Sequence, residues 1–274
     1  MRTLLVSAVM LAVAGTGGGH IGGLAAMLAA SPESEVHGFF RRRRNHFSEL
    51  ESAAAAFWEG DRPPSDELYA RVKARLQTRL GFVVEVVPVA ALPNTLRAHD
   101  VARREVLLSE ALDHPNRTFQ LVHVACLVEQ SRLLDRLLES SDITEGWSLS
   151  RARVELANYF AAAVLMPYGP FLEEARASKY DFDHLATRFG VSFEQACHRA
   201  TTLQREGAQG VPFFFLRVDK AGNVTKRFNA TGFPLAEHGG ACPRLDVHTS
   251  FRTPGRIVPQ FVEMPDGTQY FVFS

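Results

Sequence analysis

Between residues 35 and 204 the chain carries a mainly helical pattern of hydrophobic and polar positions. Apolar side chains recur there at three- and four-residue intervals, as they do on the buried face of an α-helix. Gly81 ends the second of these segments and Pro167 follows the fourth. The helices predicted in this way span residues 35–58, 66–80, 117–137, 149–166, 181–189 and 193–204.

Polar residues at two helix starts predict local caps. Ser65 and Asp66 are placed to cap the helix over 66–80. Ser192 and Gln195 lie three residues apart, the spacing of a capping box in which each side chain bonds the backbone N–H of the other residue.

Short runs rich in β-branched and aromatic residues predict strands in two regions. Residues 82–89 (FVVEVVPV) and 104–110 (REVLLSE) are expected to pair in a small sheet. Further along, the chain predicts two hairpins, one around residues 221–223 (AGN) and one around Asp266–Gly267, a dipeptide typical of tight turns. The sequence therefore predicts an α+β fold, in which a mainly helical core with a small sheet precedes a β-hairpin-rich C-terminal domain.

Residues 1–30 differ from the rest, because a short apolar run is followed by a glycine cluster. Gly17, Gly19 and Gly22 have the GxGxxG spacing of a phosphate-binding loop and resemble the start of some nucleotide-sugar glycosyltransferases. No alternating strands and helices of a doubly wound sheet follow them. A signal peptide is a second alternative, but the run has no clear cleavage site and is short for a membrane span. We expect residues 1–30 to be an unstructured lead or a product of start-codon choice.

Composition and charge narrow the class further. A content of 46% hydrophobic and 22% charged residues is ordinary for a globular protein. Thirty basic residues balance thirty acidic ones, which leaves no overall positive field to attract nucleic acid. Cys126, Cys197 and Cys242 are far apart in the sequence, unlike a disulfide or CxxC zinc scaffold, and suit a reducing cytoplasm as buried apolar side chains.

The stretch RTFQLVHVACLVEQ, residues 117–130, resembles the helix of a zinc protease without its chemistry. A zincin helix has the motif HExxH, because residues four apart share a helix face and two histidines can hold zinc while the glutamate activates water. Here Val124 replaces the glutamate and Leu127 replaces the second histidine after His123. Glu155 lies near the third ligand position of active relatives but is shifted by one residue. We therefore expect no metal and no catalytic residue.

The order of the strand pair, RTFQLVHVACLVEQ, ELANYFAAAVLMPY and LATRFGVSFEQACHR is similar to the ImmA/IrrE metallopeptidase-like domain. The segments PESEVHGFFRRRRNHFSELE, VPFFFLRVDKAGNVTKRFNATGF, GGACPRLDVHTSFRTPGRI and MPDGTQYF resemble the short-chain fatty acyl-CoA regulators, the RamB/PrpR type of bacterial transcription factor. The resemblance covers residues 31–274. It implies a helical region with a degenerate peptidase-like core over 31–150 and the regulators' C-terminal domain, truncated, over 151–274.

Two departures from the family limit what the resemblance implies. No helix-turn-helix precedes residue 31, and the cysteine-rich tail usual in the family is not seen before the chain ends at Ser274. We therefore expect a sensor without its own DNA-binding domain, working as a homodimer or with a partner regulator. The helix over 193–204 could be mistaken for a DNA-recognition helix, but offers only His198, Arg199 and Arg205 as positive contacts.

The resemblance implies that the chain binds a short-chain acyl-CoA as effector, without another cofactor. Guanidinium groups suit the phosphates of CoA, and a narrow apolar slot suits the acyl group. The candidate ligand-binding residues are Arg43, Arg103, Arg104, His123, Tyr159 and Tyr168. Each also has a structural interpretation: the arginines as solvated surface, the histidine and tyrosines as hydrogen-bonded core residues.

Two other functions stay open at this point. One is a zinc metallopeptidase of the ImmA/IrrE type with atypical ligands, in which His123 would hold the metal. The other is a nucleotide-sugar-binding enzyme that uses the glycine-rich loop. Deleting residues 1–30 should separate these hypotheses, since a sensor is expected to stay folded and such an enzyme to lose its ligand.

Overall fold

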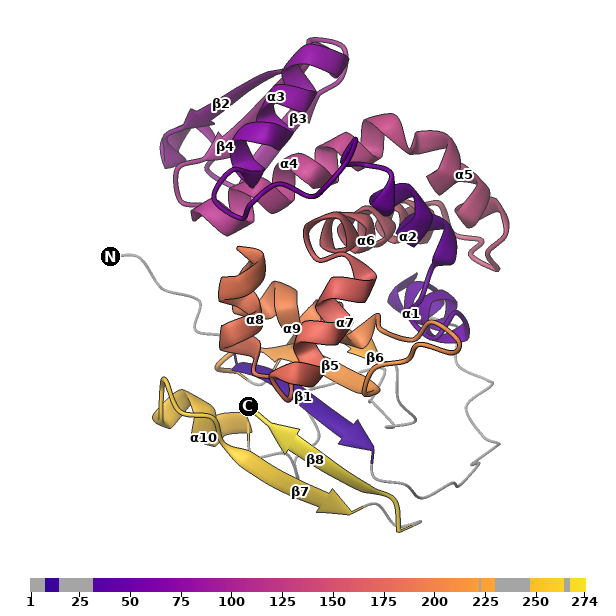
Figure 1. Cartoon of the computed structure of the whole chain (residues 1–274), viewed down its shortest axis with the longest axis vertical. Coiled ribbons are helices and arrows are strands. Elements are labelled where there is room, and N and C mark those ends of the chain that lie inside the picture. The colour runs from indigo at the N-terminus through magenta and orange to yellow at the C-terminus, as the bar shows by residue number, and fades with distance from the viewer. Residues whose placement is uncertain (1–7, 15–31, 222, 230–246, 264–266) are drawn as a thin grey trace. The chain divides into compact units, whose positions relative to one another are not determined.

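The structure is a computed structural model, and it describes residues 8–14, 32–221, 223–229, 247–263 and 267–274. It divides into two compact units (Figure 1). The first combines Met1–His46 with Ala200–Ser274, and the second is the continuous segment Phe47–Arg199. No helix among the described residues has both the length and the apolar character needed to cross a membrane.

The second unit is mainly helical. Two long helices, α4 and α6, pack against each other; α2 and α5 pack on α6, and α3 packs on α4. The pairing of α4 with α6 follows from sequence, because both carry runs of small and apolar residues that are fully buried. The helices of this unit are α2 (Ser48–Ala55), α3 (Leu68–Leu80), η1 (Val89–Ala91), α4 (His114–Glu129), α5 (Ser131–Glu139), α6 (Gly146–Leu165), α7 (Tyr168–Ala177), α8 (Phe182–Phe189) and most of α9 (Phe193–Thr201).

A three-stranded sheet completes the second unit, with strand order β2-β4-β3. The predicted pairing is confirmed, since β2 (Val83–Val87) and β4 (Glu105–Ser109) run parallel with Val84 opposite Val106. The third strand, β3 (Arg97–Asp100), lies antiparallel at the edge and was not predicted. Its sequence, RAHD, lacks the β-branched residues and the alternation that marked the other two strands.

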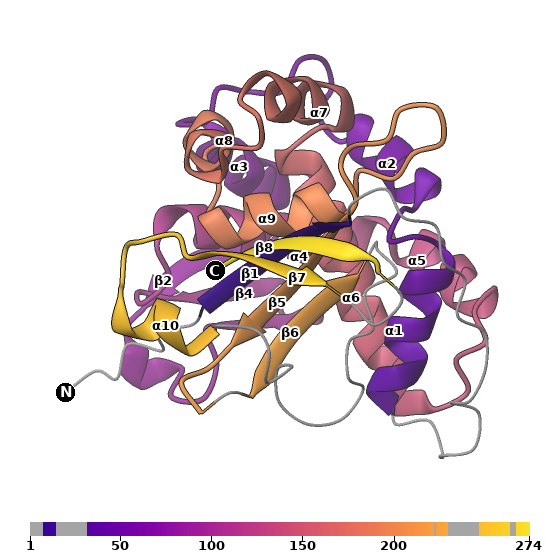
Figure 2. The same ribbon diagram turned by 90° about the horizontal axis from the view of Figure 1, so that it is seen from below.

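The first unit contains a five-stranded antiparallel sheet of order β6-β5-β1-β8-β7, seen in Figure 2. Both predicted hairpins are present. One joins β5 (Phe213–Val218) to β6 (Val224–Asn229), and the other joins β7 (Pro259–Glu263) to β8 (Gln269–Phe273). The unit also holds α1 (Pro32–Arg42) and α10 (Val247–Arg252). These findings confirm the predicted α+β class.

The prediction of an unstructured lead is wrong for residues 8–14. They form β1 (Ala8–Ala14), the central strand of the five-stranded sheet, paired with β5 on one side and β8 on the other (Figure 2). The error has a physical cause: both partners lie about 200 residues or more along the chain, so no local pattern reveals the pairing. The glycine cluster at Gly17, Gly19 and Gly22 lies outside the described residues.

Several predicted boundaries differ from those observed. The helix predicted over 35–58 is interrupted, because Arg44 and Asn45 adopt φ values of 50° and 53°, in the left-handed region that ends a helix. The helix predicted over 117–137 breaks at Gln130 into α4 and α5. The domain boundary proposed at 150 falls inside α6, while the compact units divide after residues 46 and 199.

Candidate functional site

The helix α4 positions His123 in the core of the second unit. Its start is fixed by Asp113, whose carboxylate accepts a hydrogen bond from the backbone N–H of Asn116 at 2.9 Å, with a proline in the first turn. His123 is 2% exposed and is surrounded on its own helix by buried apolar residues. A buried imidazole needs hydrogen-bond partners, and the structure supplies two.

His123 is held in one tautomer as a neutral acceptor. Its Nδ1 lies 2.5 Å from Nη1 of Arg97 on the edge strand β3. A guanidinium has only donors, so Nδ1 accepts and the imidazole proton sits on Nε2. Burial, followed by the charge of Arg97, lowers the pKa of His123 to about 3. A hydrogen bond between the ring and the backbone at Val154 of α6 acts in the opposite sense to burial and raises the pKa.

The positions that hold zinc in an active zincin carry other chemistry here. Val124 is fully buried, and Leu127 is half-buried. Glu155, near the third ligand position, bonds instead to Arg151 at 2.8 Å and accepts from Asn158 at 3.2 Å. In the described parts of the chain, no three histidine, cysteine, aspartate or glutamate side chains gather closely enough to hold a metal ion.

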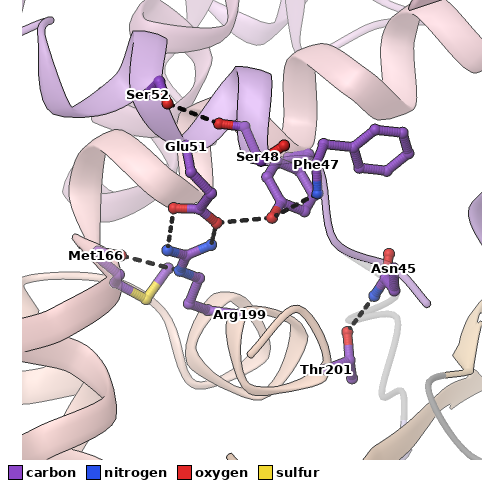
Figure 3. A network of polar contacts seen from close by, with 9 residues as sticks. Asn45, Phe47, Ser48, Glu51, Ser52, Met166, Arg199 and Thr201 are labelled. Atoms are coloured by element: carbon purple, nitrogen blue, oxygen red, sulfur yellow. Dashed lines mark hydrogen bonds and ion pairs between the residues drawn. The ribbon is translucent and has the colours of Figure 1, made fainter. Parts of the chain in front are cut away.

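A second polar cluster in this unit centres on Arg199, which is fully buried (Figure 3). Its guanidinium pairs with both carboxylate oxygens of Glu51, at 2.6 and 2.9 Å, and Nε donates to the backbone oxygen of Met166 at 2.9 Å. Tyr159 donates its hydroxyl proton to Glu51 at 2.7 Å and accepts from the backbone N–H of Phe47 at 3.2 Å. The cluster thus joins α2, α6, α9 and the α6–α7 junction.

The proposed acyl slot of His123, Tyr159 and Tyr168 is divided between these two clusters. The guanidinium of Arg199 lies over the rings of Tyr159 and Tyr168, at 6.0 and 5.6 Å from their centroids. His123 pairs with Arg97 instead. Burial, and then the carboxylate of Glu51, raise the pKa of Tyr159 well above its usual value. Both tyrosines are therefore placed as partners of a buried cation.

The candidate phosphate-binding arginines fall in two places. Arg103 and Arg104 are exposed in the turn between β3 and β4; Arg103 lies 3.8 Å from Asp100, and Arg104 has φ 54° and covers Gly81. Arg43 lies in the turn that follows α1, in the other unit. The structure brings Arg103 and Arg104 together on one turn and gives no such grouping for Arg43.

Three residues of these clusters were missed by sequence reasoning: Arg97, Glu51 and Arg199. Arg199 was counted as a surface charge on a helix that resembles a DNA reader, whereas it has no exposed area. Its partner Glu51 is 148 residues away, so no local signal linked them. Arg97 lies on the strand that was not predicted.

The cysteines of the second unit behave as apolar core residues. Cys126 and Cys197 are buried and free, and burial raises the pKa of both thiols. Cys242 lies outside the described residues. The two described thiols therefore lack the exposure and low pKa that reactive or metal-binding cysteines need.

A cleft of about 680 Å³ lies between the Arg62–Ser65 segment and helices α7 and α8. Its walls carry both signs of charge, from Arg62 and Arg188 on one hand and Glu173 and Glu174 on the other. Arg62 donates to the backbone oxygens of Leu165 at 2.9 Å and Phe189 at 2.7 Å, and so caps the ends of α6 and α8. Burial, and then Arg188, lower the pKa of Arg62 to about 10. Because Arg62 already donates to two backbone oxygens and the walls carry two glutamates, this cleft is poorly suited to bind an anion.

Comparisons with known proteins agree with this division. Residues 77–201 match a family model described as an IrrE N-terminal-like domain of the peptidase family M78. Residues 202–274 match a model described as the C-terminal part of the short-chain fatty acyl coenzyme A regulators. The boundary between the two matches falls within two residues of the point where the chain leaves the second unit.

The relatives found are bacterial regulators. The chain is 39% identical over 247 residues to a propionyl-CoA carboxylase regulator of Cereibacter sphaeroides, covering 90% of this chain and 52% of that protein. It is 39% identical over 241 residues to the HTH-type transcriptional regulator PrpR of Mycobacterium tuberculosis, covering 88% and 49%. It is 36% identical over 240 residues to the HTH-type transcriptional regulator RamB of the same species, covering 87% of this chain and 50% of that protein. The chain thus spans about half the length of these curated relatives.

A solved structure of a Mycobacterium tuberculosis transcriptional regulator is 33% identical, with a TM-score of 0.79 over 89% of this chain and 80% of that one. Fold and site together define a class, a metallopeptidase-like helical unit combined with the sheet domain of acyl-CoA regulators. The chain belongs to the short-chain fatty acyl-CoA regulator family of transcription factors.

Proposed function

We propose that this chain is the acyl-CoA-sensing portion of a cytoplasmic bacterial regulator of short-chain fatty acid metabolism, and that it has no peptidase activity. The observation that carries the proposal is the match of residues 202–274 to the short-chain fatty acyl coenzyme A regulators, directly after a peptidase-like unit. The relatives' names, which refer to propionyl-CoA carboxylase and to transcription, support the same class of signal.

The environment of His123 supports the absence of peptidase chemistry. Its Nδ1 accepts from a guanidinium and the ring also bonds the backbone at Val154, so the imidazole is engaged by protein groups rather than by a metal ligand set. Val124 offers no general base where an active zincin has glutamate. A regulator that uses the fold for recognition alone is consistent with this replacement.

DNA binding by the described residues is not part of the proposal. The helix α9 resembles a recognition helix in sequence, but Arg199 and His198 on it are buried, and Arg199 pairs with Glu51. A recognition helix must present its basic residues to phosphates and base edges. We propose that the signal passes instead through a homodimer or a partner regulator.

The proposal is tested by thermal unfolding of the whole chain with CoA, acetyl-CoA, propionyl-CoA and longer acyl-CoA esters. A ligand that binds only the folded state stabilises it by about 2.7 kcal/mol at one hundred times its Kd. We expect a rise in Tm that depends on acyl length and persists in EDTA. A zinc-dependent rise would favour the metallopeptidase alternative, and no rise with any ester would reject sensing by this chain.

Zinc analysis of the purified chain is the matched control. One zinc ion per chain, lost in His123→Ala, would support a peptidase with atypical ligands. The contacts Arg43, Arg103, Arg104, His123, Tyr159 and Tyr168 remain proposals. Of these, Arg103 has 81% of its side chain exposed.

A further inference from the structure

The edge strand β3 places two basic residues on the face of its sheet that carries buried partners, with Arg97 half-buried and His99 still exposed. Arg97 pairs with Leu108 and His99 pairs with Val106 across the ladder to β4. Directly paired residues share a face of the sheet, and both of these partners are fully buried. Arg97 and His99 therefore lie on the face that packs toward α4, where His123 meets Arg97.

Arg97 has no carboxylate partner, in contrast to two other buried or half-buried arginines of this unit. Arg75 pairs with Glu129 at 2.8 Å, and Arg199 pairs with Glu51 at 2.6 Å. Within the described ranges, the side chain of Arg97 has one partner, the neutral imidazole of His123. Burial lowers the pKa of Arg97, and no acidic group opposes this shift.

A half-buried guanidinium without a counter-ion carries an unfavourable desolvation free energy, which the binding of an anion offsets. The bond to Nδ1 uses one N–H of Arg97 and fixes the plane of the group, so the remaining N–H donors form a preoriented fork. Such a fork matches the oxygens of a phosphate better than a single ammonium does. The next turn carries Arg103, whose contact to Asp100 is long and exposed and therefore weak.

We propose that Arg97, oriented by His123, is an anion-binding residue of the second unit and receives a phosphate group of the CoA portion of the ligand. The proposal rests on the proposed function, because a short-chain acyl-CoA carries its negative charge on the diphosphate and the 3′-phosphate. Arg103, in the exposed turn that follows β3, adds positive charge to this part of the unit. In this arrangement the position that serves metal binding in a peptidase instead orients an arginine.

The test is calorimetry of the whole chain with propionyl-CoA and with inorganic pyrophosphate, comparing Arg97→Gln with Arg71→Gln. Glutamine keeps an N–H donor for His123 but removes the charge, while Arg71 is an exposed arginine of α3 paired with Glu67, the residue that precedes the helix. A charged hydrogen bond contributes about 1.5–3 kcal/mol, so we expect roughly 10- to 100-fold weaker binding in Arg97→Gln and an unchanged Kd in Arg71→Gln. Arg97→Lys, which keeps the charge without the fork, should retain salt-dependent but weaker binding.

The outcomes separate this inference from the proposed function. If the unmodified chain binds no acyl-CoA, the proposed function fails, and an Arg97-dependent affinity for pyrophosphate would then leave an anion site for another phosphate ligand. If the unmodified chain binds propionyl-CoA and folded Arg97→Gln binds it equally well, the inference is overturned. Dephospho-CoA, which lacks the 3′-phosphate, identifies the phosphate group that Arg97 contacts. If Arg97→Gln binds dephospho-CoA more weakly than the unmodified chain does, Arg97 contacts the diphosphate. If the two proteins bind dephospho-CoA equally well, Arg97 contacts the 3′-phosphate.

Discussion

Arg199 and His123 are both buried in helices of the second unit, but the first is charged and the second is neutral. Arg199 stays charged because Glu51, a backbone oxygen and two aromatic rings surround it. His123 stays neutral because burial, and then the charge of Arg97, lower the pKa of its imidazole. Sequence reasoning could single out His123, because a known motif fixes what its neighbours should be. It could not place Arg199, because burial depends on a partner far along the chain.

The neutrality of His123 predicts a pH dependence of stability. Its pKa is about 3 in the folded chain and about 6.5 when unfolded, so between these values only the unfolded chain binds the proton. The contribution of His123 is therefore complete above pH 6.5 and declines as the pH falls toward 3. We expect a loss of about 2 kcal/mol between pH 6.5 and pH 5 from this residue, at about 1.4 kcal/mol per unit.

Urea unfolding at pH 7, 6 and 5 measures this loss. His123→Gln is the control, because an amide oxygen still accepts from Arg97 but does not titrate. Between pH 6 and pH 5 the free energy of unfolding should fall by about 1.4 kcal/mol more in the unmodified chain than in His123→Gln. The reason is that unfolding of the unmodified chain takes up about one more proton. Parallel curves for the two proteins would contradict the neutral, buried assignment.

At the scale of single elements, sequence was most informative where the determining contacts are local. The capping box is observed: the backbone N–H of Ser192 donates to the side-chain oxygen of Gln195 at 3.0 Å, and Ser192 Oγ accepts from the backbone of Gln195 at 3.2 Å. Gly81 ends α3 with φ 69°, also as predicted. The predicted cap at Ser65 fails, because its hydroxyl donates to the backbone of Arg188, 123 residues away.

The capping box predicts a measurable cost at the start of α9. Ser192→Ala removes the acceptor for one otherwise unpaired N–H group and should destabilise the chain by about 1 kcal/mol. Gln195→Ala should cost more, since its amide also donates to Asn116 of α4 at 3.0 Å. Ser150→Ala on the exposed face of α6 is the matched control, expected near zero. Equal midpoints in urea for Ser192→Ala and Ser150→Ala would show that the box contributes nothing.

At the scale of the whole molecule, the chain is organised as an insertion. The second unit is one continuous segment, and the first is assembled from the two ends of the chain. Hydrogen bonds hold the two crossover segments together on each side of the division. In the first unit, Asn45 donates to Thr201 at 2.7 Å. In the second unit, the backbone N–H of Phe47 donates to Tyr159, which lies beside Arg199. Sequence patterns placed the hairpins and helices correctly but could not reveal this organisation, because they carry no information on which distant segments meet.

The insertion gives β1 a larger role than its sequence indicated, and this changes the expected result of an N-terminal deletion. Leu11 pairs with Phe215 of β5 and Phe273 of β8, so β1 joins two hairpins that otherwise have no shared strand. Proline at position 11 lacks the backbone N–H and is tolerated poorly in a central strand. Leu11→Pro, like deletion of residues 1–30, should therefore separate the hairpins and expose their edges.

Hydrogen–deuterium exchange on the whole chain checks this prediction, with Leu11→Val as the control that keeps a good strand former. In Leu11→Pro, protection should fall in β5 and β8 and remain in α4 and α6, which pack against each other within the second unit. Unchanged protection of β5 and β8 would mean that β1 contributes nothing to the sheet. Loss of protection in all four elements would mean that the helical unit depends on the sheet for its stability, contrary to the independent packing expected of a compact inserted unit.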